Sequence, residues 1–515
     1  MRFRPKLLFI ITLIIALGLF LRLWRFEELF YYAIDEEKAA YITSSLANLK
    51  HFPAAGHPSS IGFRLGPLFY YLTAPIYRFF SPHPLSIGYL SVAASIFSIL
   101  LLYKIASKIS PKTGLIASFL YSVSFLNVIY ERRGWQLSFE SAIILVFIYS
   151  LLRLIKGSVN YLFPLALSLI LMTQLEVGLF TFIPFSFLVF VTYQIKPHKK
   201  LLLISLFLFI IANSGLLIFD LRHNFLNSRY LLNYFRRGNH VRIAENKPLT
   251  DDRSIYLAHQ LIPATLARTL YPSASNNLAI EYANCPQYLG FKRQSLPDYF
   301  IFSISLFLIY FLYRSLRLMK KKDDGQRLLF LSALFMLVHF TAISLYTYLF
   351  QGEMAEYYLL PVFVFFFISL SQTLIKLPKY LLWLSLIFFA YINIQPLMTA
   401  ENPYGLNAKK KAVKTALAAI DTLSFSLESF QTCWYSGGYR YLFTRAGREP
   451  VRSYMDQYLS EYYTPDPNKE TDRELIILTP ELVGENPAGY EAYRRQVIST
   501  SEHLGTFGAM EVYLR

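Results

Sequence analysis

Long hydrophobic runs, separated by short polar loops, fill the first 400 or so residues of the chain. Most of these runs are close to the length of about 17–25 residues that a helix needs to cross a bilayer core of about 30 Å. The pattern therefore predicts an all-α polytopic membrane protein with about eleven transmembrane helices. The expected spans fall near residues 6–24, 84–108, 112–130, 137–155, 160–175, 177–195, 200–219, 299–318, 328–350, 357–375 and 380–398.

Three longer polar segments interrupt this pattern, at residues 25–83, 220–298 and 400–515. The first contains two helix-like stretches, near 33–49 and from residue 64 onward, which are expected to lie along the membrane surface. The last has mixed polarity, an amphipathic stretch near 409–427 and a β-like run near 474–478. We therefore divide the chain into a transmembrane domain, residues 1–400, and a small α/β domain, residues 401–515.

Basic residues determine the expected topology. The chain has 50 Lys and Arg against 33 Asp and Glu, a net charge of +17. In a soluble protein this excess would suggest nucleic acid, but here the charges cluster in every second loop between apolar runs. Such loops face the cytoplasm, so we predict a cytoplasmic N-terminus, external polar segments and no nucleic-acid partner. The first run lacks a signal-peptide cleavage site and is expected to remain as a span.

The most informative polar residues follow the first span. Asp35, Glu36 and Glu37 come directly after it, with Lys38 next and Arg64 opening the second surface stretch. A sugar carried on a lipid phosphate presents its reactive carbon at headgroup level. A carboxylate there can take the proton of an attacking hydroxyl, and a cation can meet the departing phosphate. This grouping predicts a glycosyl-transfer site on the outer face. Glu37 is expected to point elsewhere and to have little role.

This order of elements resembles the GT-C glycosyltransferases, which use polyprenyl-phosphate sugars. The resemblance is closest to the protein O-mannosyltransferase, aminoarabinose transferase and galacturonosyltransferase branches, over about residues 6–230 and again near 355–375. It implies that Asp35 is the general base of an inverting transfer, followed by Glu36, and that Lys38 contacts the donor phosphate. Where relatives carry Lys-Pro, this chain has Gly66-Pro67, so we assign the missing phosphate contact to Arg64.

Further polar and aromatic residues fall where an outer cavity would open. An acid between two apolar runs is costly unless it faces water or a partner, which makes Glu176 a candidate. The loop after the third span, where relatives often carry a second acid, reads Glu131-Arg132-Arg133-Gly134-Trp135-Gln136 and does not match their pattern cleanly. For the tyrosines, an interfacial aromatic belt is an alternative role. The additional donor-binding candidates are Tyr70, Arg132, Arg133, Glu176, Arg222, His223 and Tyr357.

Other functions remain as alternatives. A multi-span transporter would place charges or helix breaks near the middle of the membrane, whereas here the charges collect at outer ends. An O-antigen polymerase or ligase would also use lipid-linked sugars, and a non-catalytic scaffold is a further alternative. We predict no cofactor and no structural metal, and leave a divalent cation, the sugar and the envelope acceptor (glycan, lipid or protein) open. Cys285 and Cys433 lie in external segments, where disulfides can persist, and we leave open whether they form a disulfide or stay unpaired.

Overall fold

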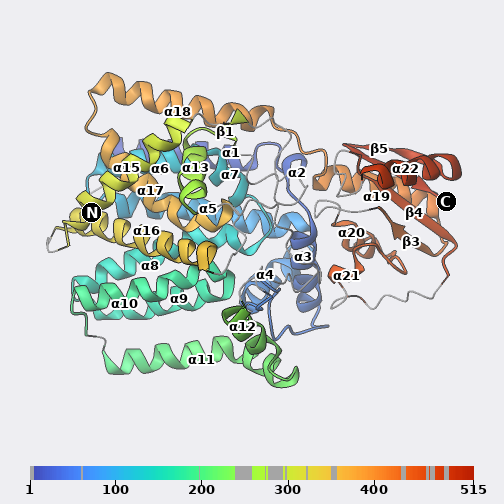
Figure 1. Cartoon of the computed structure of the whole chain (residues 1–515), viewed down its shortest axis with the longest axis horizontal. Helices are drawn as coiled ribbons and strands as arrows, with labels where there is room; N and C mark the ends of the chain where they lie inside the picture. The colour runs from blue at the N-terminus through green and yellow to red at the C-terminus, as the bar shows by residue number, and fades with distance from the viewer. Residues whose placement is uncertain are drawn as a thin grey trace.

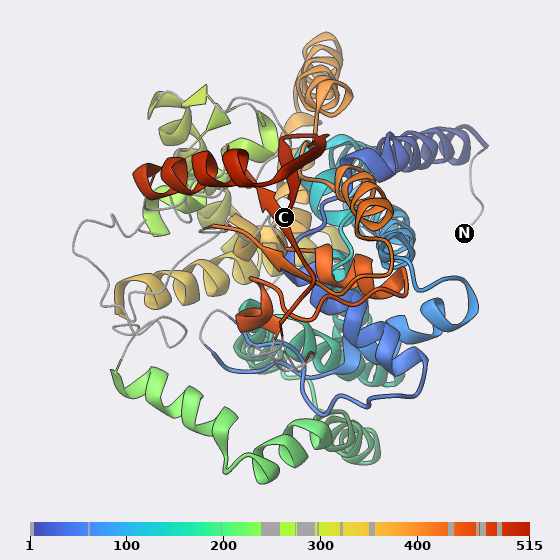
Figure 2. The ribbon, with the colours of Figure 1, turned by 90° about the vertical axis from the view of Figure 1, so that its right-hand side faces the viewer.

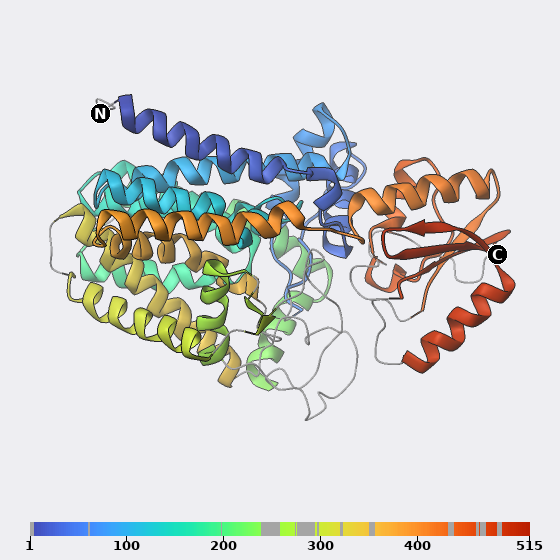
Figure 3. The same ribbon diagram turned by 90° about the horizontal axis from the view of Figure 1, so that it is seen from above.

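The protein is elongated, with long helices running side by side and a small mixed domain at one end (Figures 1 and 3). The computed structural model describes residues 5–59, 62–196, 198–237, 258–272, 274–275, 294–295, 298–319, 323–349, 356–430, 437–459, 463, 470–480 and 487–515. Cys285 and Cys433, and with them the question of a disulfide, lie outside these residues.

Within the described residues, eight helical segments are long and apolar enough to cross a membrane. They contain α1 (Pro5–Leu23), α5 (Pro84–Ala106), α8 (Glu140–Ile155, extended by η1, Gln136–Phe139), α11 (Lys199–Arg222), α15 (Asp298–Leu316), α16 (Asp324–Leu349), α17 (Leu360–Leu374, preceded by η4, Glu356–Leu359) and α18 (Lys379–Thr399). The fifth and sixth expected spans are shorter helices, α9 (Leu162–Leu175, preceded by η2, Val159–Tyr161) and α10 (Phe182–Thr192, preceded by η3, Val177–Thr181). The expected multi-pass helical architecture is confirmed.

The third expected span is broken rather than straight. Helices α6 (Pro111–Val123) and α7 (Phe125–Glu131) meet at an angle of 64° around Ser124. A break in apolar surroundings leaves backbone groups that need partners. The buried Asn393 of α18 supplies one, because its side-chain oxygen accepts the N–H of Phe125 at 2.9 Å while its amide donates to the carbonyl of Leu270.

The helices differ strongly in burial. The first part of α17, through Ser371, is almost entirely buried and forms the centre of the bundle. By contrast, α11 buries only Ser205 and Asp220, and α11 and α18 run along opposite edges in Figure 1. Helices with apolar residues on every side are stable at the periphery only where lipid surrounds them, as expected for a membrane bundle.

Between the bundle and the mixed domain lie the helices of the first polar segment (Figure 1). They are α2 (Phe26–Leu29), α3 (Ile34–Ala47) and α4 (Leu68–Phe79). The hydroxyls of Thr43 and Thr73, 3.1 Å apart, join α3 to α4. The second polar segment contributes α12 (Leu226–Arg237), α13 (Ala258–Leu270) and the two short parallel strands β1 (Ala274–Ser275) and β2 (Gln294–Ser295), none of which the sequence pattern indicated.

The C-terminal part is a small α/β domain, as expected. A four-stranded sheet has the order β3-β4-β6-β5, with β3 parallel to β4 and the other neighbours antiparallel. Figure 2 views this domain from its own end of the molecule. Its elements are α19 (Leu406–Ile420), β3 (Phe425–Glu428), α20 (Tyr439–Arg445), α21 (Asp456–Leu459), β4 (Arg473–Leu478), α22 (Pro487–Thr500), β5 (Glu502–Phe507) and β6 (Met510–Leu514).

Candidate functional site

The three acids that open α3 have different environments, because neighbouring helical side chains diverge by about 100°. Glu36 and Glu37 are buried and held by other parts of the chain. Asp35 is half-buried, and its carboxylate makes no hydrogen bond or ion pair with any residue that the structure describes. Lys38, one turn further along, is also half-buried and has no such partner among these residues.

Glu36 is paired with Arg133. The guanidinium donates to the Glu36 carboxylate at 2.7 and 2.8 Å, and the Ala33 N–H donates to its other oxygen. The arginine lies over the rings of Tyr31 and Trp135, 3.9 and 3.5 Å from their centroids. Burial raises the pKa of Glu36, and the Arg133 charge opposes that shift. Glu36 and Arg133 therefore satisfy each other, which leaves Asp35 as the acid available to a substrate.

Sequence reasoning missed a histidine at the centre of the site. His57 is 2.7 Å from the Gln136 amide through Nε2 and 3.4 Å from the Tyr70 hydroxyl through Nδ1. Burial lowers the pKa of His57 to about 4, with Asp35 opposing and with Lys38 and Arg64 adding to the shift. The imidazole is thus neutral at pH 7. The charges of Asp35, Lys38 and Arg64, three residues that the sequence singled out, all act on this imidazole.

A second group of carboxylates borders this centre. Glu176 lies in the turn between α9 and η3, where burial raises its pKa to about 7, and the Asp35 charge adds to the shift. Both Asp35 and Glu176 also interact electrostatically with the Tyr357 hydroxyl. Glu140 at the start of α8 is 1% exposed, and neither of its carboxylate oxygens has a hydrogen-bond partner among the described residues. It interacts electrostatically with Glu176. The structure thus adds Glu140 to the candidates.

The Gln174 side chain lies against Gly66, the position where relatives carry lysine. A Cβ placed on Gly66 would lie 1.5 Å from the side-chain oxygen of Gln174, so the Gln174 amide would have to move to admit a longer side chain. Arg64, the proposed substitute, donates to the Gly56 carbonyl at 3.2 Å and lies over the Phe219 ring. Its backbone is fixed by two hydrogen bonds to the side chain of Asn227.

Three further expected donor-binding residues lie at the ends of α7 and α11. Arg132 is buried, donates to the Trp24 carbonyl and lies over the Phe26 ring. Burial, reinforced by the nearby Arg22 charge, lowers the pKa of Arg132 to about 9. Arg222 and His223 are exposed at the end of α11, where His223 stacks on Phe219, the ring that Arg64 also lies over. His223 is therefore close to Arg64, whereas the described contacts of Arg132 are with Trp24 and Phe26.

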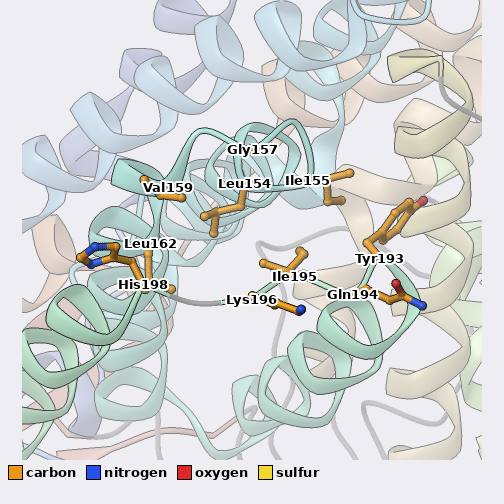
Figure 4. A pocket seen from close by; sticks show the side chains of 10 residues that line it. All are labelled: Leu154, Ile155, Gly157, Val159, Leu162, Tyr193, Gln194, Ile195, Lys196 and His198. Carbon is orange, nitrogen blue, oxygen red and sulfur yellow. The ribbon is translucent and has the colours of Figure 1, made fainter.

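A cavity of about 210 Å³ lies far from this group (Figure 4). Its lining includes Leu154 and Ile155 at the end of α8, whereas the candidate site includes Glu140 at the start of the same helix. The cavity is therefore not the candidate active site. Within the described residues, no group of three or more His, Cys, Asp or Glu side chains is arranged to hold a metal ion.

No protein-family profile and no curated protein sequence matches the chain. Solved structures do. ArnT from Cupriavidus metallidurans in the apo state matches with a TM-score of 0.50 at 10% identity, over 98% of this chain and 97% of ArnT. ArnT bound to undecaprenyl phosphate gives a TM-score of 0.49 at 9% identity, over the same shares of the two chains.

An Archaeoglobus fulgidus oligosaccharyltransferase, tethered to an acceptor peptide, gives a TM-score of 0.47 at 12% identity. That match covers 88% of this chain and 64% of the oligosaccharyltransferase. The ArnT match extends over both the bundle and the C-terminal domain, because it covers nearly the whole of each chain. The chain therefore has the GT-C fold that its sequence resemblance implied.

Proposed function

We propose that the protein is an inverting membrane glycosyltransferase that moves a sugar from a polyprenyl-phosphate donor to a cell-envelope glycan, lipid or protein. The observation that carries this proposal is the state of Asp35: the other two acids of its turn are held by protein groups, while Asp35 has no such partner in the described chain. The GT-C fold is consistent with it, and ArnT, whose fold the chain shares, has been solved with undecaprenyl phosphate.

The proposed reaction is a direct displacement. Asp35 accepts the proton of the acceptor hydroxyl while the hydroxyl oxygen bonds to the anomeric carbon. The bond from that carbon to the phosphate oxygen breaks from the opposite side, which inverts the configuration and releases polyprenyl phosphate. Lys38 and Arg64 offset the charge of the departing phosphate. Glu140, Glu176 and Tyr357 border this region and are available to hydrogen-bond the sugar hydroxyls.

The function is tested by incubating the purified protein with a panel of polyprenyl-phosphate sugars and measuring released polyprenyl phosphate. Transfer to an envelope acceptor with inversion supports the proposal. Release only when a lipid-linked glycan, rather than a single sugar, is supplied would favour a polymerase or ligase. Movement of solute across proteoliposomes without any release would favour a transporter.

Arg64 should contribute to donor binding. Replacing Arg64 with Ala should weaken binding of the donor by about 10-fold or more, the scale of a lost charge-assisted hydrogen bond. Lys at this position should restore binding only in part, because an ammonium cannot make the paired contacts of a guanidinium. Titration of a fluorescent polyprenyl phosphate measures the effect. If donor affinity is unchanged in Arg64→Ala, Lys38 becomes the candidate contact for the donor phosphate. Arg133 is not the next candidate, because it is already paired with Glu36.

The topology can be tested independently. The distribution of basic loops predicts a cytoplasmic N-terminus and an external C-terminal domain. A reporter enzyme that works only outside the cytoplasm should therefore be active when it is fused after Arg515. The same reporter should be inactive when it is inserted in the 314–322 loop, which we expect to be cytoplasmic. The opposite result would place Asp35 on the cytoplasmic face and contradict an external acceptor.

A further inference from the structure

The first turn of α3 is bound to the C-terminal domain through Glu37. This carboxylate is fully buried and accepts the backbone N–H of Gly438 at 2.7 Å and that of Tyr441 at 2.8 Å. Both donors belong to the start of α20, where N–H groups lack partners within the helix. Glu37 therefore caps a helix more than 400 residues away in sequence. The expectation that Glu37 has little role is contradicted by these contacts.

Lys409 of α19 makes a second contact between the segment around α3 and the C-terminal domain. Its ammonium is buried and donates to the carbonyls of Tyr32 and Gly437, both at 2.6 Å. One of these belongs to the segment before α3 and the other to the segment before α20, so a single side chain joins the two. Burial lowers the pKa of Lys409 to about 7, and the charges of Glu37 and Glu36 oppose the shift.

The two backbones approach too closely for side chains between them. A Cβ on Gly437 would lie 3.0 Å from the Ile34 nitrogen, and one on Gly438 would lie 2.8 Å from the Tyr32 ring. Gly438 also has φ of 102°, a conformation that other residues adopt at a cost. Ile34 itself packs on Met455 and Leu459 of the C-terminal domain.

We propose that the C-terminal domain is part of the catalytic apparatus, with Glu37 and Lys409 as positioning residues for Asp35. No described partner orients the Asp35 carboxylate, so its direction depends on the backbone of α3. That backbone is held on both sides of Asp35, at Ile34 and at Glu37, by the C-terminal domain. The inference rests on the proposed function, and displacement of a catalytic group by about 1 Å costs about 10²-fold in rate.

Two adjacent lysines provide a matched test in the full-length protein. Lys409→Met removes the buried ammonium that joins the two segments. Lys410→Met removes an ammonium that pairs with Glu27, and the side chains of Lys410 and Glu27 are each about two-fifths exposed. We expect kcat to fall by about 10²-fold in Lys409→Met, with little change in the KM for donor. Lys410→Met should retain nearly full activity, because exposed ion pairs contribute little.

Hydrogen exchange separates this inference from the proposed function. Amides in the first turn of α3 should exchange faster in Lys409→Met and at the wild-type rate in Lys410→Met, whatever the enzyme's activity. If wild-type protein transfers no sugar but exchange responds in this way, the proposed function fails and the anchoring of α3 stands. Unchanged exchange and kcat in Lys409→Met would overturn the inference.

Two further variants guard against simple misfolding. Gly437→Ala introduces one methyl group against Ile34 and should lower kcat several-fold while the protein still folds. Glu37→Gln combined with Lys409→Met removes both buried charges, so its loss of kcat should be smaller than the product of the two single losses. If the kcat losses of Glu37→Gln and Lys409→Met multiply in the double variant, or if Gly437→Ala leaves kcat unchanged, Glu37 and Lys409 do not share a positioning role.

Discussion

Replacing Asp35 with Asn should reduce turnover by about 10²-fold or more, the usual loss when a general base is removed. Asparagine has the same shape but cannot take a proton from the acceptor hydroxyl. Because Asp35 makes no hydrogen bond or ion pair within the described chain, the substitution should leave folding and donor binding intact. Single-turnover transfer from a defined polyprenyl-phosphate sugar, together with donor titration, measures both effects.

The control for this variant is Glu28→Gln. Glu28 is an exposed acid in the same polar segment, and its one ion pair among the described residues is with Arg25 at i−3, so Glu28→Gln should be nearly silent. Glu36 and Glu37 are unsuitable controls, since both are buried in contacts that fix α3. If Asp35→Asn retains wild-type turnover, Asp35 is not the base and Glu176 becomes the next acid to test.

The largest effect on stability is expected for Arg22→Met. Arg22 is fully buried at the end of α1 and pairs with Glu131 at 2.6 Å, while donating to the carbonyls of Gly18 and Ser122. Its removal leaves a buried carboxylate without its counter-charge, which costs about 3–5 kcal/mol. Unfolding of the purified protein in detergent, by heat or by denaturing surfactant, measures the loss.

Two comparisons make this result specific. Removing both charges in Arg22→Met/Glu131→Leu should recover much of the lost stability, because no unpaired charge remains. Glu28→Gln breaks the exposed pair with Arg25 and should change stability by less than about 1 kcal/mol. Wild-type stability in the single Arg22 variant would mean that water or lipid headgroups reach Glu131.

The spans and the position of Asp35 could be predicted from the sequence because each depends on local signals. Apolar length predicts a membrane helix, and an acid beside the outer end of a span is visible in one short window. The same reasoning singled out Lys38 and Arg64, whose charges act on the same histidine as that of Asp35, but their role as donor contacts stays a prediction. The bend at Ser124 was not predictable, because its supporting residue, Asn393, is 268 positions away from Phe125.

Most of the remaining site depends on contacts between distant residues. Arg133 looked like a donor ligand, but Glu36, 97 positions earlier, is its partner. Glu140 was hidden because it lies inside an apolar run that reads as a span, although an acid there is itself unusual. Glu37 and Lys409 each resemble ordinary surface charges, and only the folded C-terminal domain explains their burial.

The separation of Glu37 from its partners also affects when the proposed site is completed during synthesis. Tyr441 follows Glu37 by 404 residues, so at synthesis rates of about 5–20 residues per second α3 emerges roughly 20–80 s before the domain that holds it. During that interval a nascent chain already contains Asp35, but the contacts that Ile34 and Glu37 make with the C-terminal domain are still missing. If Asp35 is the base, as proposed, full turnover is expected only once the C-terminal domain has folded, so that unfinished chains react little with the donor.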